Sequence, residues 1–425
     1  MEFLNDIWNK TGKDINDFKE EIRKLSEQTK IEEVNMDDFN FLNITDSGTE
    51  LVAFPLNIRN LWRKTKTSFS LKKLPINRCV ISAYYDDTTT DEALKNGLMV
   101  CFSDKKLSPA KINEKLHNGA YMPISEKAIG TISNRIRHGG TSFSEPGLIR
   151  DLVIASKFSK PVSVYAVQRI DPETKKAKLF AVMSDKYTVI PQETVLDIID
   201  KVTAEALKDL GRTECNNWLI DHSVTRIYLD FPDCGSDFAE EYKLPDEMVP
   251  GIMIETSDIG DSSLRLKGYF RLGGNLTYVE NEFTQIHTGE LKMSDVIDVV
   301  ADRIFPEYRI YPEKLAKFMM IDITEPSMPK AARIKKMTSL YRDVSRKIGL
   351  VKAIGKKREK SLIDQLIAGI NPEIDYTAYD IAQTFLTLSS TIEVENKSVV
   401  ELISNTVRNV IEYNFDDKDD EITVI

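Results

Sequence analysis

Two hairpin-like stretches constrain the fold more than any other feature of this chain. Residues 162–184 carry alternating side chains on either side of an Asp-Pro-Glu-Thr turn. Residues 251–271 repeat the arrangement around Ser-Asp-Ile-Gly-Asp. Each unit predicts an antiparallel β-hairpin, and one face of a hairpin has to be buried against another layer. The chain is therefore expected to contain a mixed or antiparallel sheet with helices packed on it.

Helical periodicity dominates much of the remaining sequence. Apolar residues recur every three or four positions between Pro191 and Gly211, and helical patterns return at 293–304 and 312–319. Beyond residue 327 the chain is predicted to be entirely helical. The sequence thus indicates an α+β protein, with a mixed or antiparallel sheet core, flanking helices and an all-helical C-terminal part.

We divide the chain into four regions on this basis. The first is predicted as helical because apolar residues within 13–33 recur at helical spacing, separated mostly by charged residues. The predicted regions are an N-terminal helical arm (residues 1–50), an α+β core domain (residues 51–325), a helical C-terminal region with a basic helix (residues 326–412) and an acidic tail (residues 413–425).

Composition and short motifs exclude several classes of protein. No stretch approaches the roughly 18 apolar residues of a membrane-spanning helix, and the N-terminus lacks the basic-then-apolar pattern of a signal peptide. The four cysteines form no C-x-x-C pair, and no P-loop, G-x-S-x-G or H-E-x-x-H motif occurs. We therefore expect a cytoplasmic protein that is not an enzyme, uses no metal or other cofactor and has no membrane partner.

One strongly basic segment contrasts with the acidic chain around it. The formal net charge is −10, whereas residues 329–360 contain twelve Lys or Arg and only two acids. Apolar residues recur at helical spacing within this segment, at Ile334, Met337, Tyr341, Val344 and Ile348. That spacing predicts a helix with an apolar seam on the core and most bases on its other faces.

Such a surface concentrates positive potential where a phosphate backbone could lie. We predict nucleic acid as the partner, with phosphate contacts from Arg333, Lys335, Lys336, Arg342, Arg346 and Lys347. Three other interpretations stay open for the segment. It could be a solvated basic face, it could dock on an acidic surface of a neighbouring subunit such as residues 233–247, or it could lie on an anionic membrane.

A second basic stretch lies nearer the N-terminus. Residues 51–85 contain seven bases and no acid, with aromatic residues interleaved. Bases and aromatic rings together suit single-stranded nucleic acid, because rings stack on bases while cations follow phosphates. The residues predicted to act here are Trp62, Arg63, Lys64 and Lys66. The alternative is that the aromatic residues anchor the core and the bases only surround them.

The acidic residues of the chain suggest two further possibilities. The tail from Glu412 carries six acids and one Lys before ending Ile-Thr-Val-Ile, and it resembles the C-terminal peptides with which single-strand DNA-binding proteins recruit partners. It could instead occupy the protein's own basic surface, or simply aid solubility. Residues 233–247 are expected to form an acidic loop, and its acids could hold a divalent cation, which leaves a metal-dependent nuclease as an alternative.

Four short segments of the middle of the chain form one further pattern: Tyr165–Arg169, Leu179–Tyr187, Ile252–Ser263 and Ile286–Gly289. In these segments the chain resembles a family of phage- and plasmid-encoded proteins of unknown function. In that family a C-x-N segment follows the third piece, whereas this chain has Leu272-Gly-Gly-Asn275 there and lacks the cysteine. The resemblance covers about a third of the chain, carries no catalytic residue across, and implies a role beside recombination and single-strand annealing functions.

Together these features lead to one main hypothesis and one rival from another class. We expect a non-enzymatic nucleic-acid-binding protein of a phage or mobile element, forming a homo-oligomer and binding single-stranded DNA to assist recombination or annealing. The rival is a structural protein of a phage particle, a capsid or tail component found in the virion, whose basic segments would face packaged DNA or a neighbouring subunit.

Overall fold

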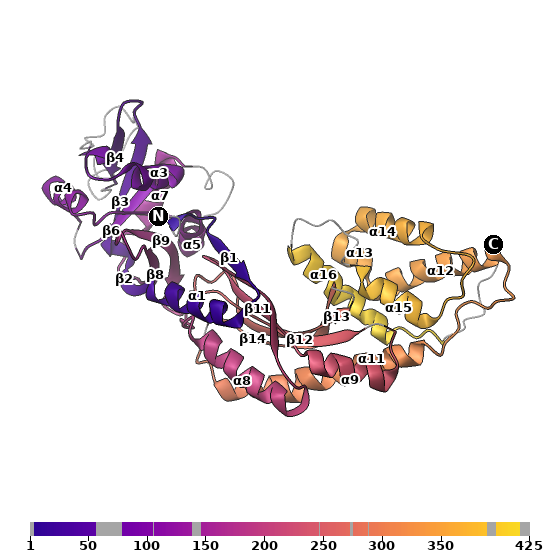
Figure 1. Cartoon of the computed structure of the whole chain (residues 1–425). Coiled ribbons are helices and arrows are strands. Elements are labelled where there is room, and N and C mark those ends of the chain that lie inside the picture. The colour runs from indigo at the N-terminus through magenta and orange to yellow at the C-terminus, as the bar shows by residue number, and fades with distance from the viewer. Residues whose placement is uncertain are drawn as a thin grey trace.

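The computed structural model describes residues 4–416, apart from residues 57–78, 105, 138–145, 246, 273–274, 288 and 389–396. Its described strands form three sheets whose neighbouring strands pair antiparallel. The molecule is elongated, with an N-terminal lobe and a C-terminal helical lobe at opposite ends of the largest sheet (Figure 1). The predicted α+β class is confirmed, and so is the helical character of the C-terminal part.

The largest sheet has six strands in the order β1-β10-β11-β12-β13-β14. Its strands are β1 (Asn9–Gly12), β10 (Glu214–Asp221), β11 (Thr225–Asp230), β12 (Met248–Thr256), β13 (Leu264–Leu272) and β14 (Asn275–Gln285). The second predicted hairpin is confirmed as β12 and β13, which pair from Met248 with Leu272 to Glu255 with Arg265.

The two faces of this sheet differ in chemistry because side chains alternate along each strand. On one face, buried residues such as Ile227, Ile254 and Phe270 belong to the main hydrophobic core. Helices lie along this side of the sheet (Figure 1), namely α8 (Thr194–Asp209), α9 (Pro232–Tyr242), α10 (Met293–Val299), a π-helical turn (Val300–Ile304) and α11 (Phe305–Phe318). The other face carries paired charges, among them Arg271 with Asp230.

The N-terminal lobe contains the two smaller sheets. One has the order β2-β8-β9 and the other the order β5-β4-β3-β6-β7. The strands are β2 (Thr29–Asn35), β3 (Phe39–Asp46), β4 (Leu51–Pro55), β5 (Cys79–Val80), β6 (Leu98–Phe102), β7 (Met122–Pro123), β8 (Ser163–Ile170) and β9 (Ala177–Ser184). The helices are α3 (Asp87–Asn96), α4 (Pro109–His117), α5 (Glu126–Ile136) and α7 (Leu148–Lys157). The first predicted hairpin is confirmed as β8 and β9.

The prediction of a helical arm over residues 1–50 is wrong. The predicted helix exists as α1 (Ile15–Glu27), but strands β1, β2 and β3 surround it and belong to all three sheets. The apolar stripe of α1, with Phe18, Ile22 and Leu25 fully buried, is part of the main core and not a peripheral surface. Strands β2 and β3 have seven and eight residues that mix polar and apolar side chains, and their pairing depends on distant partners.

The described part of the C-terminal region contains five helices. They are α12 (Lys330–Ile348), α13 (Leu350–Ile354), α14 (Lys356–Ala368), α15 (Ala378–Leu386) and α16 (Lys397–Val407), followed by a 3-10 turn (Arg408–Glu412). This region joins the largest sheet at β14, where the Thr277 hydroxyl donates to the Leu386 carbonyl at 2.9 Å. The Ser404 hydroxyl likewise donates to the Leu276 carbonyl at 2.8 Å. The helices therefore rest on the end of the sheet.

Candidate nucleic-acid interface

The basic segment folds as three helices and not as one. Helix α12 ends at Gly349 and α13 ends at Gly355, both of which have positive φ. The predicted apolar seam is confirmed at Met337, Val344 and Ile348, which are buried in the main core. Ile334 is an exception because it is 38% exposed. The seam fixes α12 on the fold, so its basic residues are carried by a rigid support.

Arg333 does not lie on the exposed side of α12, which corrects its prediction as a phosphate ligand. Its side chain is only 5% exposed. The guanidinium donates to the carbonyls of Pro372, Ile374 and Glu325 at 2.8–2.9 Å, and it pairs with Asp375. A buried guanidinium bound to three carbonyls holds the 371–377 loop against α12 and has no donor aimed at solvent phosphates.

Arg346 and Lys347 are exposed, but each already has an anionic neighbour. Both pair with Asp343 one turn earlier on α12. Partial burial would raise the pKa of Asp343, but the Tyr413 hydroxyl and the charges of Lys347 and Arg346 together hold that pKa below its usual value. The carboxylate is therefore ionised at neutral pH and offsets part of the positive charge at this end of the helix.

Most bases of the segment remain available to a ligand. Within the part of the chain that the structure describes, eight of the twelve are exposed and form no ion pair: Lys335, Lys336, Arg342, Lys352, Lys356, Lys357, Arg358 and Lys360. We call these eight residues, together with Arg346 and Lys347, the basic surface. Arginine and lysine without an acidic partner keep their full charge for an incoming anion.

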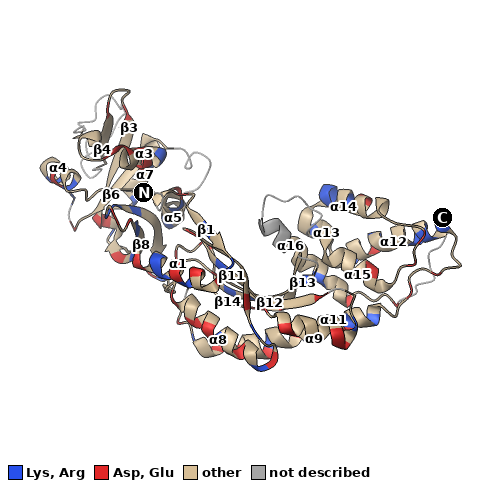
Figure 2. Cartoon of the chain, viewed as in Figure 1, with Lys and Arg blue, Asp and Glu red and all other residues tan. Residues whose placement is uncertain are grey.

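Three of the predicted residues of α12 lie on the same outer side of the helix. At 3.6 residues per turn, Lys335, Arg342 and Arg346 fall within about 40° of each other around the helix axis and span about 16 Å. Figure 2 shows basic residues on α12 and at the start of α14, whereas acidic residues are concentrated on α8 and α9. These basic and acidic residues, which lie in different segments of the sequence, therefore also lie in different parts of the molecule.

Helix α14 adds cations that were counted in the sequence but not selected as ligands. Lys356, Lys357, Arg358 and Lys360 all lie in its first turns and are exposed. Glu359, the acid among them, accepts a 2.6 Å hydrogen bond from the buried Ser345 hydroxyl of α12. That contact ties the first turn of α14 to the C-terminal half of α12. The packing of the two helices, which the sequence does not show, therefore brings a second group of cations close to those of α12.

The second predicted basic site cannot be placed. Trp62, Arg63, Lys64 and Lys66 lie outside the described residues. Strand β4 leads into that stretch and β5 follows it, and these two strands pair at Val52 with Val80 and Ala53 with Cys79. The prediction for the four residues stays a prediction.

The acidic residues around 233–247 do not form a loop, which corrects that prediction. They lie largely on α9, which begins at Pro232, a residue suited to the first helical turn. Asp233 is engaged by Arg212, whose backbone N–H and Nε donate to it at 2.9 and 2.8 Å. Across the described residues, no group of three or more His, Cys, Asp or Glu is placed to hold a metal ion.

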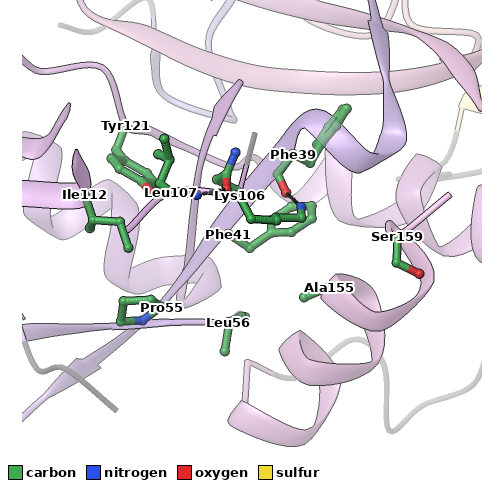
Figure 3. Close-up of a pocket in the computed structure, with 11 residues that line it drawn as sticks. Phe39, Phe41, Pro55, Leu56, Lys106, Leu107, Ile112, Tyr121, Ala155 and Ser159 are labelled. Atoms are coloured by element: carbon green, nitrogen blue, oxygen red, sulfur yellow. Dashed lines mark hydrogen bonds between the residues drawn. The ribbon is translucent and has the colours of Figure 1, made fainter. Parts of the chain in front are cut away.

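The N-terminal lobe contains a small hollow. It lies between Phe39, Leu56 and Tyr121, and the Lys106 ammonium closes one side by donating to the Phe39 carbonyl at 2.7 Å (Figure 3). Its volume is about 30 Å³. A single water needs roughly 10–15 Å³ on this measure, so the hollow holds one or two waters and is too small for a nucleotide or cofactor.

Comparison with known proteins adds no functional evidence. No protein-family model, curated protein or solved structure matches this chain. The resemblance noted over residues 165–290 therefore stays a prediction. Among the described helices, none combines the length and the apolar character needed to cross a membrane.

Proposed function

We propose that this chain is a non-enzymatic nucleic-acid-binding protein, and that its partner lies along the basic surface of α12 and α14. The observation that carries the proposal is the set of eight exposed cations without an ion pair in the described structure, on a chain whose net charge is −10. Cations that lie close together without acidic partners repel each other. A polyanion would relieve that repulsion and release its own counterions.

Single-stranded DNA is the favoured partner, in a role that assists recombination or annealing in a phage or mobile element. This finer part of the proposal depends on the family resemblance and on the aromatic residues around Trp62, which lie outside the described residues. A homo-oligomer is part of the same proposal, because several copies would extend the contact along a strand.

The test is charge reversal at three exposed residues of α12 that have no ion pair. The variant Lys335→Glu, Lys336→Glu, Arg342→Glu should bind a labelled single-stranded oligonucleotide on the order of 100-fold more weakly at 0.1 M salt. The slope of log K against log salt should become shallower by about 2, because each lost phosphate contact removes roughly 0.7 from a single-strand slope. Fluorescence anisotropy across a salt series measures both quantities.

A matched control separates the surface from the net charge. Reversal of Lys201, Lys208 and Lys317 on α8 and α11 changes the total charge by the same amount at exposed positions. It should leave most of the affinity intact. Equal losses in the two variants, or no oligonucleotide binding by the wild-type chain, would reject the interface. Equal affinity for single and double strands would reject the single-strand preference alone.

A further inference from the structure

The chain's acidic tail leaves the fold beside the basic surface. Tyr413 donates its hydroxyl to the Asp343 carboxylate of α12 at 2.7 Å, and the Lys347 ammonium lies 5.1 Å from the centre of its ring. Phe415 is buried, with its ring 4.8 Å from that of Phe318 at the end of α11. These contacts fix residues 413–415, so everything that follows is tethered at the end of α12 that carries Arg346 and Lys347.

The tail has the charge and the length to cover this surface. Residues 416–425 contain five acids, at Asp416, Asp417, Asp419, Asp420 and Glu421, against one lysine. Ten residues reach at most about 33–36 Å when extended. Helix α12 has 19 residues and is therefore about 28 Å long. A tail anchored at one end of α12 can accordingly reach every cation on the outer side of that helix.

We propose that residues 416–425 dock on the basic surface of the same chain and compete with nucleic acid for it. The acids of the tail are complementary to cations that have no acidic partner in the described structure. The tether favours a chain's own tail over a free peptide, because covalent linkage over a short span gives effective concentrations in the millimolar range. With an intrinsic dissociation constant of about 0.1 mM, the tail would weaken nucleic-acid binding about tenfold.

Docking is tested first without nucleic acid. A fluorescent peptide of residues 416–425 is titrated with the full chain carrying Asp417→Asn, Asp419→Asn and Asp420→Asn, which removes three of the five acids of the chain's own tail. The peptide should bind this variant, and it should bind the variant more tightly than it binds the wild-type chain. Peptide binding should be lost when the charges of Lys335, Lys336 and Arg342 are also reversed. A peptide that fails to bind overturns the inference, whatever the protein does with nucleic acid.

Competition is tested second, and this part alone rests on the proposed function. The tail variant should bind a labelled oligonucleotide about tenfold more tightly than wild type at low salt, with the difference shrinking as salt rises. The matched control neutralises three exposed acids of α9, with Asp237→Asn, Glu240→Gln and Glu241→Gln. An equal gain in the control overturns the competition. Peptide binding without oligonucleotide binding by any variant rejects the proposed function and leaves the docking intact.

Discussion

At the scale of single residues, a buried ion pair joins the N-terminal lobe to the largest sheet. Arg169 of β8 is fully buried and binds Asp258, which follows β12, through two hydrogen bonds of 2.6 and 2.8 Å. The same guanidinium also donates to the His222 carbonyl at 3.4 Å. A bidentate pair of this kind fixes the orientation of both groups, so the two parts of the molecule meet in one defined arrangement.

Removal of Asp258 should therefore be strongly destabilising. Asp258→Ala leaves the Arg169 charge buried without its counter-ion, which typically costs about 3–5 kcal/mol in the free energy of unfolding. The control is Asp261→Ala, which removes the more exposed pair with Lys127 and should cost less than about 1 kcal/mol. Urea unfolding monitored by circular dichroism measures both, and similar losses in the two variants would contradict the assignment.

A second buried carboxylate should give the chain a pH-dependent stability. Burial raises the pKa of Asp151 to about 6, although Arg150 and Asn43 bind the group and oppose the shift. The folded state thus holds this proton more tightly than the unfolded state, whose pKa is about 3.9. The contribution of Asp151 to stability is therefore present below pH 4 and is lost as the pH rises to about 6.

Asp151→Asn should flatten the pH profile over this window. The loss between pH 4 and pH 6 is on the order of 2 kcal/mol in the wild-type chain, and a neutral amide cannot contribute to it. The variant is expected to be less stable overall, because Asn43 and Arg150 both donate to the carboxylate. Urea midpoints measured from pH 4 to pH 7 check the slope, and parallel profiles for the two proteins would refute the role of Asp151.

At the scale of elements, glycines decide how the basic segment is divided. The apolar spacing ends at Ile348, and so does α12, because Gly349 adopts φ 76° and caps the helix in the left-handed conformation. The rest of the basic segment therefore does not continue this helix. Glycine populates that region without the steric penalty of a β-carbon. The turn brings α14 back against α12, which is why the cations of α14 lie close to those of α12.

The acidic residues of α9 illustrate the opposite error of prediction. A loop was expected there, whereas Pro232 begins a helix.

Gly349→Ala should weaken this arrangement. The substitution meets no neighbouring atom within 4 Å, so its cost of about 1 kcal/mol comes from the positive φ alone. Gly130 in α5 is a matched control, because it is exposed, helical and equally free of neighbours. Gly130→Ala should raise the stability by about 0.5–1 kcal/mol. Thermal or urea unfolding gives the sign of each change, and opposite signs are the expected result.

At the scale of the whole molecule, the main core does not stop at the predicted boundary near residue 326. One continuous cluster of buried residues includes Ile254 and Val279 of the largest sheet and Met337, Tyr341 and Phe385 of the C-terminal helices. The Arg408 guanidinium also donates to the Val279 carbonyl at 3.2 Å. The basic surface is consequently supported by the sheet and not by an independent helical bundle.

The isolated C-terminal region should therefore fail to fold cooperatively. A fragment of residues 326–425 would expose the apolar sides that α15 and α16 place against β14. Burial of apolar area is the main favourable term in folding, and a fragment of this size without its partner sheet loses much of it. Circular dichroism should show a broad thermal transition, whereas a sharp two-state transition in the fragment would contradict a shared core.

The sequence by itself determined the helices with strong apolar periodicity, both hairpins and the excess of positive charge between residues 329 and 360. These features are local, so spacing and composition are enough to predict them. The tertiary structure alone decided the rest. It pairs β1, β2 and β3 with distant strands, buries Arg333 beneath three carbonyls, and ties the first turn of α14 to α12 through Glu359 and Ser345. Pairing and burial depend on residues far apart in the chain, and no local pattern encodes which side of a helix its neighbours will cover.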